Sequence, residues 1–418
     1  MRQILLLTYT FPPDNMAAAA RPAHIYKYLP EHDYQPIVIA SSNEGALDVN
    51  DLVYRVPSGG EPLGIKFLSN LTRRLMRYCA PYNDRLPWAP VAAYAGMRLV
   101  RSRQIAAIYS TSPFLASHLA AYWLKAKFGL PWIADFQDPV LDNPMRNRNW
   151  VYPYDSLIEN LIFRKADRLV ANTDTVATAW RKRYPRWAAK MSVLWNSFDP
   201  IDKIEISQRP SRVYRVLAHV GGLYGQRHPG LVLSTLERLG ISSLDLRVKL
   251  VGPIELTILD RQQGLFDRMR QSGVLEFENR LVPREEAKRE TAEADCLLLL
   301  DLNDSNASFQ VPSKLLEYVR FGKPILAYTP TDSPVERILE RSGIAYVAVD
   351  PAAPGSIGDQ KVREFLSLST APRSPSSWFE ETFSATTEAR TLAGLLNDLL
   401  PPKRLNGIDG SHSFRDVK

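Results

Sequence analysis

Residues 311–318, Val-Pro-Ser-Lys-Leu-Leu-Glu-Tyr, bring together a turn, the start of a helix, a cation and a carboxylate. A polar loop turns at Pro312, and in the helix that follows Lys314 and Glu317 lie three residues apart on one face. The free N–H groups and partial positive charge of a helix N-terminus attract anions, and Lys314 adds a full charge. Glu317 can accept hydrogen bonds from a diol. Phosphate and sugar together predict a nucleotide-sugar site, and the simpler alternative is an exposed Glu–Lys pair.

A second candidate is the glycine-rich segment 220–227, Val-Gly-Gly-Leu-Tyr-Gly-Gln-Arg, between an expected strand and an expected helix. Gly221, Gly222 and Gly225 permit tight turns and a close approach of a ligand to the backbone. Arg227 can hold a diphosphate through two parallel hydrogen bonds. The spacing does not match the dinucleotide fingerprint G-x-G-x-x-G. Taken alone, the segment is better explained as a turn with a solvated arginine.

Further polar segments follow expected strands. Gly252, in Leu-Val-Gly-Pro at 250–253, and Leu281, in the loop 278–283, belong to the edge at which open α/β sheets bind ligands, and the backbone of the second loop can read a nucleobase. In the first half, Asp135 and Asp138 end a strand and are candidates to bind a sugar hydroxyl, a metal or the acceptor proton. A turn and helix cap formed by Asp138 is the alternative.

Two more loops of the first half end strands at the same edge. One contains Pro13 and Asp14, and the other contains Ser112. Both are expected to face the second domain. Asp-x-x-Asp without a cluster of histidine or cysteine is not a convincing metal site, so no metal is predicted. No Ser-His-Asp or Cys-His constellation indicates a hydrolase.

Short apolar runs alternate with helical patterns along the chain, which predicts parallel βαβ units in doubly wound sheets. Strands are expected at 4–8, 36–40, 106–110, 131–136, 168–172 and 192–194, and then at 214–220, 246–251, 274–277, 296–300 and 324–328. The polar stretch 196–212 separates the two series. We therefore predict domains at 1–200 and 213–375, with the polar end of the chain, 401–418, expected to be disordered.

Composition narrows the class of protein. Hydrophobic residues make up 45% and charged residues 23%, and two cysteines exclude a disulfide framework or a zinc site. The apolar run at the N-terminus is short for a signal peptide and no run is long enough to span a membrane, so a cytoplasmic location is expected. A net charge of +7 indicates an anionic partner. The basic residues are dispersed rather than clustered with aromatics, which argues against nucleic acid.

One segment suggests contact with a membrane. Residues 65–78, Ile-Lys-Phe-Leu-Ser-Asn-Leu-Thr-Arg-Arg-Leu-Met-Arg-Tyr, have the pattern of a basic amphipathic helix. Such a helix can lie on an anionic leaflet, which would make the protein peripheral on the inner face of the membrane. A helix packed on the first domain with its arginines in water is an equally good interpretation.

A set of segments, taken in order along the chain, carries a family resemblance. The set consists of Leu-Leu-Leu-Thr-Tyr-Thr-Phe-Pro-Pro-Asp-Asn, Tyr-Ser-Thr-Ser-Pro, Ala-Asp-Phe-Gln-Asp-Pro and the segments at 221–227, 250–253, 311–318 and 322–327. Over roughly residues 1–345 the chain resembles retaining glycosyltransferases of the GT-B fold. It is most similar to the fourth-family group, the glycogen synthase and mannosyltransferase-like enzymes of bacterial polysaccharide synthesis.

This resemblance implies two facing Rossmann-like domains, the second holding a UDP- or GDP-sugar and the first a glycan or polyprenyl-linked acceptor. It implies that Arg227 binds the diphosphate, Glu317 the ribose, and the loop 310–313 the phosphate and sugar. The helices at 376–400 would cross back onto the first domain. The predicted donor residues are Gly221, Gly222, Arg227, Gly252, Leu281, Gln310, Val311, Ser313, Lys314 and Glu317, and the predicted acceptor-side residues are Pro13, Asp14, Ser112 and Gln137.

For the reaction we expect Arg227 and Lys314 to stabilise the leaving phosphate and Asp138 or Asp135 to orient the acceptor, with no cofactor. Three positions depart from the family pattern: Phe309 replaces a glutamate, Gly222 replaces an arginine, and Gln137 replaces a histidine. Two alternatives therefore stay open. One is a non-catalytic binding protein that kept the fold, and the other is a nucleotide-sugar epimerase.

Overall fold

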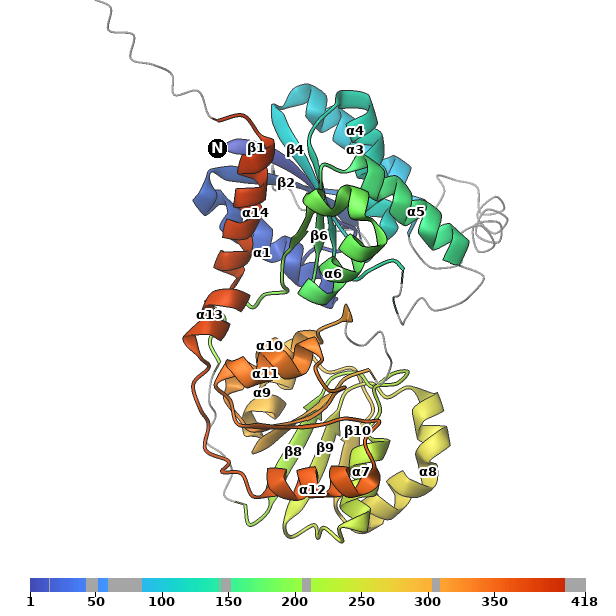
Figure 1. Ribbon diagram of the computed structural model, residues 1–418, viewed down its shortest axis with the longest axis vertical. Helices are drawn as coiled ribbons and strands as arrows, with labels where there is room; N and C mark the ends of the chain where they lie inside the picture. The colour runs from blue at the N-terminus through green and yellow to red at the C-terminus, as the bar shows by residue number, and fades with distance from the viewer. Residues whose placement is uncertain are drawn as a thin grey trace, which may run out of the picture.

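The computed structural model describes residues 1–14, 16–42, 52–58, 85–141, 143, 152–204, 212–302 and 309–402. Within them the chain forms two α/β domains, each built on a sheet whose strand pairs are all parallel (Figure 1). The predicted fold class of two doubly wound parallel sheets is confirmed. The predicted basic helix at 65–78 and the tail from residue 403 lie outside the described residues.

The first sheet has seven strands in the order β3-β2-β1-β4-β5-β6-β7. In chain order these are β1 Arg2–Leu7, β2 Tyr34–Ser42, β3 Val53–Pro57, β4 Ile105–Thr111, β5 Trp132–Phe136, β6 Arg168–Ala171 and β7 Met191–Val193. The helices are η1 Ala17–Ala19, α1 Ala20–Tyr28, η2 Leu29–His32, α3 Trp88–Ser102, α4 Leu115–Phe128, α5 Tyr152–Lys165, α6 Asp174–Arg183 and η3 Pro185–Lys190.

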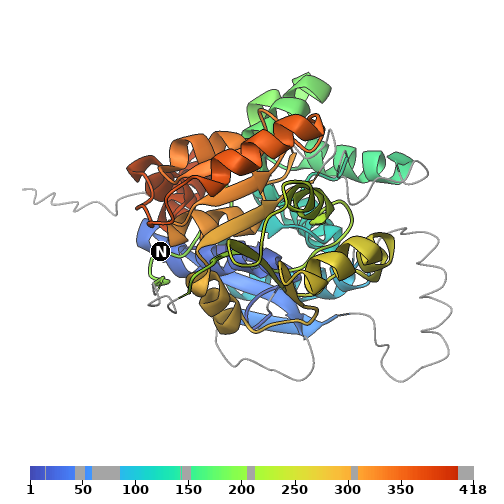
Figure 2. The ribbon, with the colours of Figure 1, turned by 90° about the horizontal axis from the view of Figure 1, so that it is seen from below.

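The second sheet has six strands in the order β10-β9-β8-β11-β12-β13. They are β8 Arg215–Val220, β9 Leu246–Val251, β10 Leu275–Glu278, β11 Cys296–Leu300, β12 Ile325–Tyr328 and β13 Tyr346–Val349. The helices are α7 Gly230–Arg238, α8 Leu256–Gln271, α9 Arg284–Glu293, α10 Ser313–Phe321, α11 Pro334–Ser342 and α12 Gly355–Leu366, and the view from below in Figure 2 shows helices on both faces of this sheet.

Alternation along the strands divides each core into two layers. In β1, Leu5 and Leu7 pack with α3 to α6, whereas Ile4 and Leu6 pack with α1 and the last helix, because successive side chains point to opposite faces. In the second domain α7, α8 and α12 cover one face, and α9, α10 and α11 cover the other. The central strand β11, Cys-Leu-Leu-Leu-Leu, is buried throughout, as expected for a strand covered on both faces.

Two segments connect the domains. The first follows β7, and the second runs through α13 Ser377–Phe383 into α14 Ala385–Leu399. They meet where Phe198 N–H donates to the Phe383 carbonyl and Ala385 N–H donates to the Phe198 carbonyl, both at 2.9 Å. Leu392 and Leu396 of α14 then pack into the first domain beside α1 (Figure 1). The C-terminal helix therefore completes the first domain.

Several elements were not foreseen from the sequence, namely β3, β13, α3, α6, α8, α11 and α12. Helix α3 shows why: three of the buried residues along this Ala-rich stretch, Ala92, Ala93 and Gly96, are small and contrast little with their neighbours. None of the helices in the described ranges is long and apolar enough to cross a membrane.

Candidate functional site

At the carboxyl edge of the second sheet, the loops after β8 and β9 touch backbone to backbone. Gly221 has φ +135° and Gly252 has φ +136°. A Cβ added to Gly252 would lie 2.6 Å from the carbonyl of Gly221, and Gly221 N–H donates to the Val251 carbonyl at 2.6 Å. At Gly252 both the positive φ and the neighbouring backbone exclude a side chain, and at Gly221 the positive φ favours glycine.

The same two loops are linked further along. Leu223 N–H donates to the Pro253 carbonyl at 2.9 Å, and Glu255 N–H donates to the Leu223 carbonyl at 2.9 Å. The Glu255 carboxylate accepts from Gly225 N–H at 2.8 Å. These bonds fix the path of the glycine-rich loop up to Arg227.

Arg227 is half-buried at the end of this loop. Its Nη1 donates to the Tyr224 hydroxyl at 2.7 Å, and its guanidinium lies 5.4 Å from the centre of the Tyr224 ring. Its Nε is buried and makes no hydrogen bond with a described residue. One edge of the guanidinium is thus held in place while Nε still has a hydrogen to donate, a suitable arrangement for an anion.

Lys314, in the first turn of α10, lies over the glycine loop. A Cβ on Gly221 would collide with Nζ and Cε of Lys314, so the absent side chain of residue 221 makes room for the ammonium. Burial lowers the pKa of Lys314 to about 8, with Arg227 lowering it and Glu317 raising it. Two cations, Arg227 and Lys314, therefore converge beside the glycine loop, which is where the sequence predicted a phosphate.

His219, which sequence reasoning did not select, supports Lys314. Its Nε2 lies 3.4 Å from the ammonium of Lys314, and its Nδ1 lies 3.0 Å from the Leu298 carbonyl oxygen. Burial first and Lys314 second hold the pKa of His219 well below its ordinary value, so the ring is neutral. The sequence does contain a signal for this residue: His219 is a polar residue in a largely apolar strand, two positions before Gly221.

Glu317 lies one turn further along α10. It is half-buried and makes no hydrogen bond or ion pair with any residue that the structure describes. Burial raises the pKa of Glu317, and the positive charges of Arg284, Lys288 and Lys314 lower it. The carboxylate is thus held in a basic environment with its oxygens open to a ligand.

The other predicted donor residues take different positions. Ser313 is exposed at the start of α10, whereas Gln310 is buried and Val311 packs partly into the core of the second domain. Leu281 is 84% exposed in the loop between β10 and α9. The nearby Asn279 accepts a hydrogen bond from Ile254 N–H at 2.8 Å, which joins this loop to the loop after β9.

In the first domain the two predicted carboxylates differ. Asp135 is wholly buried: Arg21 donates to it at 2.5 Å, and the hydroxyls of Tyr109 and Thr111 each donate at 2.7 Å. Burial raises its pKa, and Arg21 lowers it. Because the domain itself occupies this carboxylate, the geometry favours a structural role for Asp135 over the predicted contact with an acceptor.

Asp138 faces the second domain instead. Burial raises its pKa to about 6, and the positive charges of Arg227 and Arg21 act against that rise. Arg227 follows β8 and Asp138 follows β5. Because the charge of Arg227 acts on Asp138, the carboxyl edges of the two sheets face each other. Asp301, at the end of β11, lies on the same side: burial raises its pKa to about 6, and Arg227 is among the groups that lower it.

The predicted acceptor-side residues form the loops around Asp138. Ser112 Oγ accepts from Gln137 N–H at 2.9 Å, and Gln137 Nε2 donates to the Ala18 carbonyl at 3.1 Å. Pro13 is exposed, and Asp14 Oδ1 accepts from Met16 N–H at 3.2 Å. Gln137 therefore holds η1 against the end of β5.

Two contacts cross between the facing edges. Phe309, which precedes α10, packs partly buried against the core of the first domain. Arg337 of α11 donates to Thr175 Oγ1 at 3.1 Å and lies 3.5 Å from the Asp174 carboxylate. The residue that departs from the family's glutamate thus makes an apolar contact between the domains.

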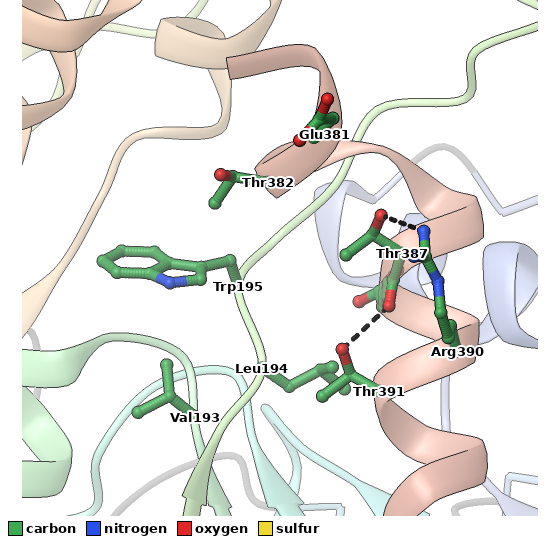
Figure 3. Close-up of a pocket in the computed structure, with 9 residues that line it drawn as sticks. Val193, Leu194, Trp195, Glu381, Thr382, Thr387, Arg390 and Thr391 are labelled. Atoms are coloured by element: carbon green, nitrogen blue, oxygen red, sulfur yellow. Dashed lines mark hydrogen bonds between the residues drawn. The ribbon is translucent and has the colours of Figure 1, made fainter. Parts of the chain in front are cut away.

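A separate cavity of about 440 Å³ lies at the connection between the domains (Figure 3). Its lining residues come from the segment after β7 and from α13 and α14; they are Val193, Leu194, Trp195, Glu381, Thr382, Thr387, Glu388, Arg390 and Thr391. Arg390 donates to Thr387 Oγ1 and Thr391 donates to the Thr387 carbonyl, both at 2.9 Å, so one wall is braced within α14. Neither Arg227 nor Lys314 lines this cavity, which is therefore distinct from the phosphate-binding candidate.

Behind this cavity, Arg21 joins the first domain to both connecting segments. Its Nη2 donates to the Leu194 carbonyl at 2.7 Å and to Asn196 Oδ1 at 2.9 Å, and its Nε lies 3.1 Å from the Glu388 carboxylate. Among the described residues, no group of three or more histidine, cysteine, aspartate or glutamate side chains is placed to hold a metal ion.

Two parallel α/β domains with facing carboxyl edges, the second of which carries two cations beside a glycine loop, have the architecture of the GT-B fold. Residues 17–196 match the family model described as a glycosyl transferase 4-like domain. The predicted resemblance to glycosyltransferases of the GT-B fold is thereby confirmed. No curated protein matches the chain by sequence.

Solved structures share this fold over nearly the whole chain. HepE from Anabaena in complex with UDP is similar with a TM-score of 0.63 at 15% identity, over 96% of this chain and 100% of HepE. Trehalose-6-phosphate synthase OtsA is similar with a TM-score of 0.65 at 11% identity, over 96% of this chain and 100% of OtsA. UDP-GlcNAc 2-epimerase from Methanocaldococcus jannaschii is similar with a TM-score of 0.54 at 10% identity, over 95% of this chain and 99% of the epimerase. At these identities the likeness establishes the fold alone.

Proposed function

We propose that this protein transfers a sugar from a UDP- or GDP-sugar to a glycan or polyprenyl-linked acceptor, with retention at the anomeric carbon, in the synthesis of a cell-surface polysaccharide. The observation that carries the proposal is that Lys314 lies over Gly221 within the field of Arg227, with Glu317 one turn beyond Lys314 on α10. This set matches the charges and hydroxyls of a nucleoside diphosphate. The HepE structures in complex with UDP and with UDP-glucose support UDP as the donor nucleotide.

In the proposed reaction the donor diphosphate lies against the glycine loop and the N-terminus of α10. Negative charge builds on the β-phosphate as the bond to the sugar breaks. Arg227 and Lys314 stabilise this charge, and because both are fixed by packing, little reorganisation is needed in the transition state. Glu317 accepts hydrogen bonds from the ribose.

Asp138 is the residue that we assign to the acceptor. With a pKa of about 6 its carboxylate is largely ionised at neutral pH, and it can accept the hydrogen bond of an attacking hydroxyl. In a front-face reaction that retains configuration, the leaving phosphate takes the proton of that hydroxyl. The scheme uses no metal or other cofactor, and we place the enzyme in the cytoplasm at the inner face of the membrane.

The experiment is an assay of the wild type, Arg227→Ala and Glu317→Ala with a panel of UDP- and GDP-sugars and glycan or polyprenyl-phosphate acceptors. Arg363→Ala, an exposed change on α12, is the matched control. We expect product with one donor, and a loss of roughly a hundredfold or more in kcat/KM for Arg227→Ala, as for removal of one charge-stabilising group. Unchanged turnover in both variants would refute the assignment.

The same assay separates the alternatives. Conversion of the donor sugar without any acceptor identifies an epimerase, whose fold this chain shares. A thermal shift with nucleotides but no turnover of any donor identifies a binding protein, since a bound ligand raises stability by mass action. The NMR coupling constant of the anomeric proton in the product reports retention or inversion.

A further inference from the structure

The outer surface of α3, α4 and α5 carries apolar and positive side chains together. These helices cover the face of the first sheet opposite α1 and α14, and they lie side by side (Figure 1). Each exposes one large apolar side chain: Tyr94 is 62% exposed, Trp123 43% and Leu157 68%. Tryptophan is seldom so exposed, and three such residues on neighbouring helices are no longer isolated cases.

The part of this surface that α3 and α4 form is positive because acidic residues are missing from that stretch of the sequence. From Arg85 to Ala134 there is no Asp or Glu, while six residues are Lys or Arg. On α3, Tyr94, Arg98 and Arg101 follow one exposed stripe, and on α4 Trp123 and Lys127 follow another. Helical spacing of four residues places Arg98 beside Tyr94 and Lys127 beside Trp123, and Arg101 lies one turn beyond Arg98 on the same stripe.

Within the described ranges, the other charges nearby do not cancel these cations. Asp155 and Glu159 of α5 are buried, and Asp167 forms an ion pair with Lys125 at 2.5 Å. Arg85 lies over the rings of Tyr9 and Phe114, and Arg103 over the ring of Tyr54. In contrast, Arg98, Arg101 and Lys127 are exposed and make no ion pair with any residue in the described ranges.

We infer that Tyr94, Trp123, Arg98, Arg101 and Lys127 form a docking surface for an anionic lipid bilayer, hereafter the aromatic-basic face. The two rings lie on helices packed against each other, whose axes are about 8–10 Å apart, so both can enter one membrane interface. Tyr and Trp favour the headgroup region because their rings are apolar and their ends polar, and Lys and Arg are attracted by anionic lipid. An acidic protein or a duplex nucleic acid would need the cations but not two exposed rings.

The inference rests on the membrane location given under the proposed function, and vesicle binding tests it apart from the reaction. Full-length protein is floated with vesicles of phosphatidylcholine alone and with vesicles that contain phosphatidylglycerol as well. We expect binding only to the anionic vesicles, weakened about fivefold for each cation removed in Arg98→Gln, Arg101→Gln and Lys127→Gln. Tyr94→Ser with Trp123→Ser should also release the protein, which distinguishes insertion from simple attraction of charge.

The matched control is Ile357→Ser with Arg363→Gln on α12, where an apolar side chain and a cation are likewise exposed. This control should float like the wild type, and thermal melts establish that each variant is folded. If the charge variants float normally, or if the control is released equally, the aromatic-basic face does not dock. Binding to heparin or DNA with no binding to anionic vesicles would likewise overturn the inference.

Discussion

The ammonium nitrogen of Lys314 lies 3.4 Å from Nε2 of His219. The Leu298 carbonyl near Nδ1 of His219 can only accept a hydrogen bond, so Nδ1 carries the hydrogen and Nε2 offers its lone pair to Lys314. A neutral ring therefore positions the ammonium of Lys314 and leaves its positive charge intact, whereas a carboxylate in the same place would neutralise that charge. The charge of Lys314 stays available to an anion above Gly221.

Nucleotide affinity should depend on pH through Lys314. Its pKa is lowered by burial to about 8, so raising the pH removes the proton and with it the charge that attracts a diphosphate. Affinity for UDP is expected to fall by up to roughly tenfold per unit as the pH rises above about 8. Isothermal titration in matched buffers measures this profile. Lys314→Arg, whose guanidinium stays protonated, should flatten it, and an equally steep fall in that variant would exclude Lys314 as the cause.

The role of Glu317 can be measured with nucleotide analogues. If its carboxylate binds the ribose, Glu317→Ala should weaken the binding of UDP by about 1.5–3 kcal/mol, which is roughly a tenfold to hundredfold loss of affinity. The wild type should discriminate against 2′,3′-dideoxy-UDP, and the variant should bind both nucleotides alike. Discrimination that survives in Glu317→Ala would place the ribose elsewhere.

Gly221 should be required for nucleotide binding rather than only for folding. Gly221→Ala puts a Cβ at φ +135° against the end of Lys314, so the ammonium must move away from the loop. Affinity for UDP is expected to fall by about tenfold or more, the loss of a charged hydrogen bond. Gly240→Ala is the control, since φ is also positive (+65°) but nothing lies within 4 Å of the added Cβ. It should cost stability of roughly 1–2 kcal/mol and leave affinity unchanged.

Arg21 should contribute much more to stability than a surface cation does. It is 2% exposed between Asp135 and Glu388, and its removal leaves two buried carboxylates without a counter-charge. Arg21→Met is expected to lower the free energy of unfolding by about 3–5 kcal/mol. Lys27→Met, which breaks a 2.6 Å pair with Asp199 on the surface, should cost about 0–1 kcal/mol. Urea denaturation compares the two, and equal losses would contradict this account.

The sequence by itself determined the two strand–helix series and the loops that carry the site. Segments such as 296–300 and 315–321 are strongly apolar or periodic, and Gly221, Gly252 and Pro312 mark local turns, so the positions of Arg227, Lys314 and Glu317 followed from short-range signals. Several helices that were missed, such as α6, α8 and α11, are polar on average. They are stabilised by the sheet on which they pack.

Only the tertiary structure decided which of two carboxylates faces the second domain. Asp135 and Asp138 look equivalent in the sequence, yet Asp135 is enclosed by Arg21, Tyr109 and Thr111, which come from distant parts of the chain. Asp138, three residues later, meets the field of Arg227 from the other domain. Burial and long-range partners set the charge and accessibility of a side chain, and these depend on residues that no local pattern can bring together.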